Sequence, residues 1–213
     1  MTPGPLPDRL APGAGRVTLP LLAAAALAAL VVPPAGALLL LAAGFSLWFF
    51  RDPDREPAGA GVLAPADGRV SVLREEGDRL RVGVFMSPFD VHVNRAPVGG
   101  EVREVTHRGA AHRPAFCKDS DRNERVEFAV AADESDDGGT TEFGCALVAG
   151  WFARRITPYV SGGERVTRGG RVGHIAFGSR ADVLLPPSYD REDVRVREGE
   201  RVYAGRSVLA RRE

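Results

Sequence analysis

A stretch of 34 residues without a charged side chain, from Val17 to Phe50, constrains this chain more than any other feature. A straight helix of that length would be about 51 Å long, whereas the hydrocarbon core of a bilayer is about 30 Å thick. Pro33 and Pro34 divide the stretch into two apolar halves of 16 residues each, and prolines interrupt helices. The sequence therefore predicts a helical hairpin that turns at the prolines and either crosses the bilayer or dips into one leaflet.

Charges on both sides of this hairpin indicate which side of the membrane its ends face. Arg9 and Arg16 precede it, Arg51 and Arg55 follow it, and positive residues favour the cytoplasmic side. We therefore expect the protein at the cell membrane, with its larger part on the cytoplasmic face. Two other interpretations are a buried helix pair and a signal peptide cleaved near residues 35–37, although the apolar run continues for 13 residues beyond that point.

Three regions follow from this division. Residues 1–16, rich in proline and glycine, are expected to form a flexible tail, residues 17–50 the membrane hairpin, and residues 51–213 a single domain. The last region alternates apolar and polar residues in short runs separated by glycine-rich turns, which is typical of strands. We expect a mainly β domain of sandwich or barrel-like form.

The pattern G-E-R-V-x-x-G occurs twice in this domain, at residues 163–169 and 199–205. Each copy is followed by a short apolar strand, and glycine supplies the positive φ that tight corners require. The two copies resemble the folded hairpins of biotinyl and lipoyl carrier domains. A carrier needs a lysine at an exposed hairpin tip, and neither copy has one. The likeness therefore extends to the fold and not to the function.

Several motifs from Phe49 onward resemble, in the same order, those of the phosphatidylserine decarboxylase family in its short bacterial and archaeal branch. They are Phe49-Phe50-Arg51-Asp52-Pro53, Ala64-Pro65-Ala66-Asp67-Gly68, Ser87-Pro88-Phe89-Asp90-Val91-His92-Val93-Asn94-Arg95, Asn123-Glu124-Arg125, residues 149–156, and Phe177-Gly178-Ser179-Arg180. The resemblance implies a membrane-associated enzyme that decarboxylates phosphatidylserine to phosphatidylethanolamine and CO2.

The same resemblance implies a covalent pyruvoyl cofactor that the chain makes from its own serine. Cleavage between Gly178 and Ser179 would give a β chain of residues 1–178 and an α chain of residues 179–213, which stay associated. Decarboxylating an α-amino acid needs an electron acceptor, and the usual alternative is pyridoxal phosphate on a lysine. Lys118 is the only lysine, and the sequence lacks a doubly wound α/β pattern, so the pyruvoyl route is favoured.

Catalytic roles in this family fall on Ser179, His92 and Asp67. We expect a base within hydrogen-bond reach of the serine and a carboxylate that orients the base. In the longer branch a second histidine completes the processing triad, and Arg95 stands at that position here. Either His92 acts both as the processing base and as the later proton donor, or another group takes the first role.

Three further residues are candidates for substrate binding. Arg95 and Arg180 carry guanidinium groups that suit a phosphate or a carboxylate. His174 lies five residues before Ser179 on an alternating strand. The histidines and cysteines do not follow a metal-ligand spacing, so no metal is implied.

The expected partners are phosphatidylserine, the lipid surface and a further copy of the chain, since oligomers occur in the resembled family. A net charge of zero gives no reason to expect nucleic acid. Two alternatives stay open: a decarboxylase of an ether-linked archaeal serine phospholipid, and a non-catalytic membrane-anchored β-domain that binds lipid or protein. A serine hydrolase is disfavoured because Ser179 is not in a G-x-S-x-G motif.

Overall fold

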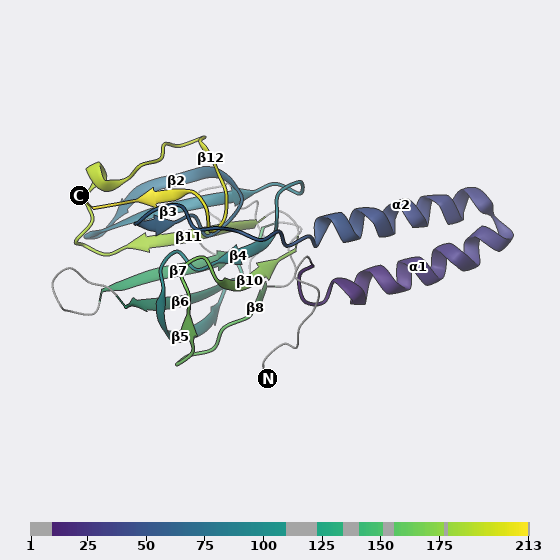
Figure 1. The fold of residues 1–213 in the computed structure, drawn as a ribbon, viewed down its shortest axis with the longest axis horizontal. Coiled ribbons are helices and arrows are strands. Elements are labelled where there is room, and N and C mark those ends of the chain that lie inside the picture. The colour runs from purple at the N-terminus through teal and green to yellow at the C-terminus, as the bar shows by residue number, and fades with distance from the viewer. Residues whose placement is uncertain (1–9, 110–122, 134–140, 151–155, 177–178, 213) are drawn as a thin grey trace. The chain divides into compact units, whose positions relative to one another are not determined.

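The computed structural model describes residues 10–109, 123–133, 141–150, 156–176 and 179–212. The chain falls into two compact units, Met1–Asp54 and Arg55–Glu213. The first unit is helical and the second is built of strands (Figure 1). The mainly β fold expected after an apolar helix pair is therefore confirmed.

Two helices, α1 (Ala14–Val31) and α2 (Pro33–Phe49), form the first unit as a hairpin that turns at Val32. Pro33 occupies the first turn of α2, where its missing N–H costs nothing. Gly36 allows the helices to pack closely, because a Cβ at this position would lie only 2.6 Å from Ala29 Cα. The predicted hairpin and its turn at the prolines are confirmed, although α1 begins three residues earlier than Val17.

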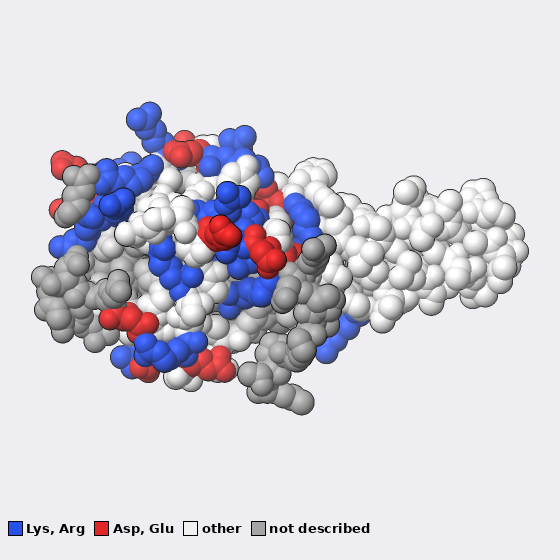
Figure 2. Space-filling model, viewed as in Figure 1, with Lys and Arg blue, Asp and Glu red and all other residues white. Residues whose placement is uncertain are grey.

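Helix α1 is long and apolar enough to cross a membrane by length and composition. Its 18 residues span about 27 Å, close to the thickness of a bilayer core. The surface of the pair is almost entirely uncharged in Figure 2, whereas acidic and basic side chains mix on the visible face of the β unit. Within the helix pair, the hydroxyls of Thr18 and Ser46 satisfy each other at 3.0 Å.

Antiparallel strands make up the second unit, in sheets of eight, three and two strands among the described residues. The eight-stranded sheet has the order β12-β2-β3-β11-β7-β6-β5-β9, and the smaller sheets have the orders β4-β10-β8 and β1-β13. The strands are β1 (Val62–Leu63), β2 (Gly68–Glu76), β3 (Arg79–Met86), β4 (Val93–Arg95), β5 (Gly100–Arg108), β6 (Arg125–Ala132), β7 (Glu142–Val148), β8 (Ile156–Pro158), β9 (Arg165–Val166), β10 (Arg171–Ile175), β11 (Ser179–Leu185), β12 (Arg201–Val202) and β13 (Val208–Ala210).

Each copy of the repeated glycine pattern contains an edge strand of the large sheet. Gly163 and Gly169 have φ of +84° and +78°, and Gly199 and Gly205 have φ of +83° and +67°. These left-handed conformations are the ones that glycine adopts at little cost. The first copy contains β9 and the second contains β12, which are the two ends of the strand order. The repeat therefore marks two equivalent corners of the fold.

A single apolar core connects the three sheets. Strand β11 contributes Ala181, Val183 and Leu185, none of which is exposed, and β1 and β13 contribute Val62 and Leu209 to the same core. Successive residues of a strand point to opposite faces. Ser179 has the parity of these three residues, so its side chain points toward the core.

Candidate active site

Ser179 is the first residue of β11, a central strand held between β3 and β7. Its side chain is completely buried. Met86 lies directly opposite it on β3, with its sulfur 3.9 Å from the serine Oγ. Gly178, the other half of the expected cleavage site, lies outside the described residues. The candidate nucleophile thus sits on the inner face of the sheet, at the end of a strand.

Strand β4 brings the histidine-containing motif to the same place. The N–H of Arg95 donates to the carbonyl of Pro65 at 2.9 Å, so β4 lies beside the turn that carries Asp67. The neighbouring Asn94 has its Nδ2 3.5 Å from the same carbonyl and 3.5 Å from Met86 Sδ. Met86 therefore lies between the side chains of Asn94 and Ser179, and three motifs that are distant in sequence meet around it.

His92 is buried and its ring is oriented by the main chain. Nδ1 lies 2.9 Å from the carbonyl oxygen of Asp90. A carbonyl only accepts, so Nδ1 carries the hydrogen, and the neutral ring has its lone pair on Nε2. The carbonyl of His92 itself accepts from the N–H of Ile175 at 3.3 Å. This tautomer gives the ring a basic nitrogen on the side away from Asp90.

The carboxylate of Asp67 is buried and held by two donors. Oδ2 accepts from Arg55 Nη2 at 2.8 Å, and Oδ1 accepts from the N–H of Ala204 at 2.8 Å. Burial raises the pKa of Asp67 and the nearby Asp90 charge adds to the rise, while Arg55 and the Ala204 N–H oppose it. The Asp90 carbonyl orients the His92 ring, and an orienting role for Asp67 stays a prediction.

Asp90 and Arg55 support the site and were not singled out from the sequence. The Asp90 carboxylate accepts from the N–H and the hydroxyl of Ser87 at 2.8 and 2.7 Å, and it pairs with Arg201. This capped turn fixes the carbonyl that binds His92. The serine-to-aspartate spacing of three residues in the motif is the signal that could have indicated such a turn.

Both candidate substrate arginines are largely buried and bonded within the domain. Arg95 donates to the carbonyl of Gly169 at 3.1 Å. Arg180 forms two bonds with Asp182, at 2.6 and 2.8 Å. Since Arg180 follows Ser179 directly in β11, the two side chains point to opposite faces of the sheet. A role for either arginine in binding substrate stays a prediction.

His174, the third candidate, lies on β10 opposite Val93. Paired residues of neighbouring strands share a face, so His174 and Asn94 point to opposite faces of this small sheet. Its Nδ1 lies 2.8 Å from the hydroxyl of Tyr159, and burial lowers the pKa of the imidazole. A contribution of His174 to the reaction centre also stays a prediction.

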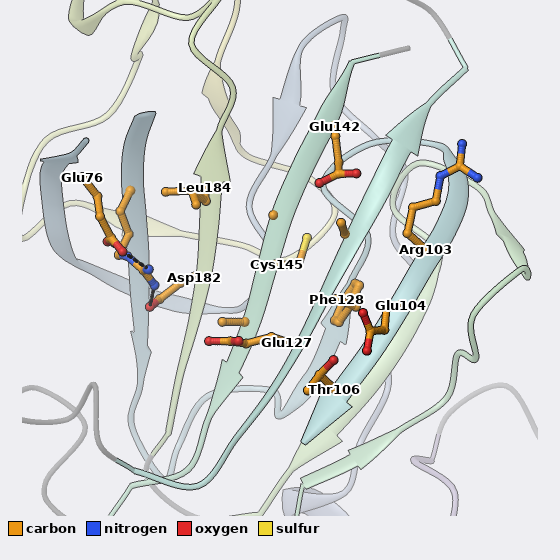
Figure 3. Close-up of a pocket in the computed structure, with 14 residues that line it drawn as sticks. Glu76, Arg103, Glu104, Thr106, Glu127, Phe128, Glu142, Cys145, Asp182 and Leu184 are labelled. Carbon is orange, nitrogen blue, oxygen red and sulfur yellow. Dashed lines mark hydrogen bonds and ion pairs between the residues drawn. The ribbon is translucent and has the colours of Figure 1, made fainter. Parts of the chain in front are cut away.

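A pocket of about 520 Å³ opens on the opposite face of the large sheet (Figure 3). It is lined by polar residues of both charges, such as Arg81, Glu127 and Asp182, together with Cys145. Burial raises the pKa of the Cys145 thiol to about 12, so it is protonated at neutral pH and is not a nucleophile. Asp182 has the strand parity opposite to Ser179, so this pocket is separate from the candidate site.

Comparison with known proteins agrees with this geometry. The sequence profile described as phosphatidylserine decarboxylase matches residues 42–210. A relative from Halobacterium salinarum, provisionally named an archaetidylserine decarboxylase proenzyme, is 57% identical over 170 residues, which cover 79% of this chain and 82% of the relative. A phosphatidylserine decarboxylase proenzyme from Thermobifida fusca is 46% identical over 171 residues, which cover 80% of this chain and 74% of the relative. The resemblance of the motifs is confirmed, and the chain belongs to the phosphatidylserine decarboxylase family.

Proposed function

We propose that this protein cleaves itself between Gly178 and Ser179, converts Ser179 to a pyruvoyl group and uses it to decarboxylate phosphatidylserine to phosphatidylethanolamine and CO2. The observation that carries the proposal is the complete burial of Ser179 at the end of a central strand, where the family's motifs converge. The proenzyme names of the relatives agree with a processing step.

Self-cleavage requires chemistry that this chain can provide from its own residues. Ser179 Oγ attacks the Gly178 carbonyl carbon, and the C–N bond breaks as the ester forms. Removal of the Ser179 Cα proton then expels the Gly178 carboxylate and leaves dehydroalanine. One water hydrolyses this group to the pyruvoyl cap and releases ammonia. His92, with its basic Nε2, is the proposed base, and Asp67 is proposed to assist it electrostatically from its buried position.

The fold suits a chain that must survive this cut. Strand β11 pairs with β3 and β7 along its length, and β12 and β13 pair with β2 and β1. The proposed α chain, residues 179–213, would therefore stay bound to residues 1–178 through backbone hydrogen bonds and core contacts. Loss of covalent continuity before residue 179 leaves these pairings in place.

The surroundings of residue 179 also fit a pyruvoyl group. The position is closed to solvent and faces the thioether of Met86, so a reactive carbonyl there is protected from bulk water. When formed, that group accepts the electron pair released as CO2 leaves. We propose that His92 then delivers a proton to the substrate α-carbon, because imidazole titrates near neutral pH.

Two serine phospholipids are candidates for the substrate. The ester-linked lipid follows from relatives named phosphatidylserine decarboxylase proenzymes. The ether-linked archaeal lipid follows from the 57% identical relative named for archaetidylserine. Both share the serine headgroup on which the chemistry acts. Assays of the purified enzyme with each lipid in matched micelles distinguish them. Family membership sets aside the non-catalytic alternative.

We propose further that the apolar hairpin holds the enzyme at the cytoplasmic face of the cell membrane, close to its lipid substrate. The length and composition of α1 support this proposal, and the arginines at both ends of the hairpin favour the cytoplasmic side. Resistance of the protein to extraction by carbonate, and its protection from protease added outside intact cells, test the two parts. A homo-oligomer stays a prediction, which size analysis in detergent tests.

Intact-mass analysis of the full-length protein tests the central proposal. Two fragments are expected, with the smaller one beginning at residue 179 and blocked at its N-terminus. Ser179→Ala should give one uncleaved chain without decarboxylase activity. Ser71→Ala is a matched control because Ser71 Oγ is also buried and lies on β2; this variant should be cleaved like the wild type. A wild-type protein that keeps an ordinary serine joined to Gly178 while active refutes the proposal.

A further inference from the structure

Asn94 is a buried polar residue in the reaction centre that the proposed chemistry does not use. Its side chain is completely inaccessible to solvent. Nδ2 makes two long contacts, each of 3.5 Å, with the Pro65 carbonyl and Met86 Sδ. Among the residues that the structure describes, Oδ1 has no hydrogen-bond partner. A buried polar atom of this kind is rare in folded proteins and requires an explanation.

The unsatisfied atom is the acceptor end of the amide. Oxygen and nitrogen of an asparagine are assigned from their surroundings. Turning the amide over would place Oδ1 against the Pro65 carbonyl, and two acceptors cannot bond each other. The orientation with Nδ2 toward Pro65 is therefore the favourable one. It leaves an amide oxygen that can be satisfied only by a donor.

Met86 relates the amide group of Asn94 to the reacting residue. Met86 Sδ lies 3.5 Å from Asn94 Nδ2 and 3.9 Å from Ser179 Oγ. His92 lies two residues before Asn94 and just outside β4, so the proposed proton donor and this amide belong to the same short motif.

The chemistry of the substrate identifies the missing donor. A serine headgroup carries a phosphate and a carboxylate, which are acceptors, and an amine, which donates. The amine is also the group that must reach the carbonyl formed at residue 179. The Ser179 hydroxyl, another donor near this site, is consumed in processing. We propose that Asn94 Oδ1 accepts a hydrogen bond from the substrate amine and holds it beside residue 179. This inference rests on the proposed function.

Steady-state kinetics of cleaved protein test the assignment. Asn94→Leu has nearly the same shape and no acceptor, whereas Asn94→Asp, which burial favours in its protonated form, keeps an acceptor oxygen and can still donate to the Pro65 carbonyl. With phosphatidylserine in detergent micelles, Asn94→Leu should raise KM about 10- to 100-fold, the loss expected for a hydrogen bond to a charged donor. Asn94→Asp should change it about threefold or less. Ser71→Ala, which removes another buried unsatisfied oxygen on β2, should leave KM unchanged.

A second readout reports on the amine directly. Cyanoborohydride should trap the substrate amine on residues 179–213, and the mass of this fragment measures the yield. The yield with Asn94→Leu should fall at low lipid concentration and recover at saturation. Rates are divided by the amount of cleaved chain, so that poorly folded protein does not count. If Asn94→Leu accumulates no cleaved chain, Asn94→Ala replaces it.

The outcomes separate this inference from the function on which it rests. Cleaved Asn94→Leu with wild-type KM and trapping overturns the role of Asn94 and leaves the proposed function intact. If Asn94→Leu and Asn94→Ala are both folded and both stay uncleaved, the proposed role is also overturned, because Asn94 then acts in processing. A wild-type protein that is never cleaved refutes the proposed function itself.

Discussion

Arg180 and Asp182 form a buried ion pair. Replacing Asp182 should reduce the free energy of unfolding more than replacing Arg180. The side chains of Arg180 and Asp182 are 3% and 1% exposed. Asp182 also accepts from Arg81 at 2.9 Å. Gly83 stands opposite Asp182 in β3, where a Cβ would lie 2.6 Å from Asp182 Oδ1. The pair therefore occupies space that a glycine leaves open, one residue from the proposed cleavage site.

The arrangement sets the size of each effect. Asp182→Asn removes the carboxylate charge that pairs with the buried Arg180 and with Arg81, so we expect a loss of about 3–5 kcal/mol in the free energy of unfolding. Arg180→Met costs about 1–3 kcal/mol, because Asp182 keeps the bond to Arg81. The double variant should resemble Arg180→Met alone. The two single losses would then exceed the double loss by about 3 kcal/mol or more.

Urea unfolding of the full-length chain in detergent, followed by far-UV circular dichroism, measures these differences. All variants carry Ser179→Ala, so that each stays a single chain and unfolding is comparable. Additive losses, or a loss below about 1 kcal/mol for Asp182→Asn, would refute the reasoning. A double variant that unfolds like Arg180→Met would assign Arg180 to the stability of β11.

Three other predictions concern the proposed site. His92→Asn should slow self-cleavage and lower turnover per cleaved chain, each about 10²- to 10⁴-fold, because the amide lacks a basic nitrogen; wild-type cleavage and turnover in a lipid assay would contradict this. Burial raises the pKa of Asp67 above its ordinary value of 3.8, so its contribution to stability is complete below that pH and is lost as pH rises through the folded pKa. Two proteins that both carry Ser179→Ala, one with Asp67 and one with Asp67→Asn, test this. The melting temperature of the Asp67→Asn protein minus that of the Asp67 protein should increase from about pH 3 to pH 7. A difference that does not change with pH argues against the raised pKa. Gly68→Ala should prevent folding and cleavage, since its Cβ would lie 2.0 Å from the Phe85 carbonyl oxygen at φ +150°. Gly77→Ala, with φ +66° and open space, should cost only about 1 kcal/mol; similar cleavage yields for both glycine variants would refute the steric argument.

The helix pair and the strands were predictable because their signals are local. A run of apolar residues interrupted by Pro33 and Pro34 has few ways to fold, and period-two alternation identifies strands without knowledge of their partners. The tight corners at the repeated glycine pattern were also predictable, because a positive φ is a property of single residues. Helix α1 begins three residues before Val17 because it includes Arg16, whose charge excludes it from the apolar stretch.

Contacts between distant segments could not be predicted in the same way. Arg55 binds Asp67 and Arg201 binds Asp90, and nothing in their spacing along the chain indicates either pair. Asp182, a partner of Arg180, lies only two residues away, but predicting this pair requires knowledge of which face of β11 is buried. Asn94 belongs to a motif that the sequence shows, but its unsatisfied oxygen is evident only once Pro65 and Met86 are placed around it.

The strand order is compatible with a chain that has both the proposed cleavage site and a stable fold. Strand β11 is the fourth of eight in the large sheet, bonded on both sides. A strand at an edge would lose half of its anchoring contacts, and the fragment released by cleavage could dissociate. A central strand keeps two ladders of backbone bonds, and β12 and β13 add pairings with β2 and β1. The proposed cut therefore lies just before a segment that the sheet holds on both sides.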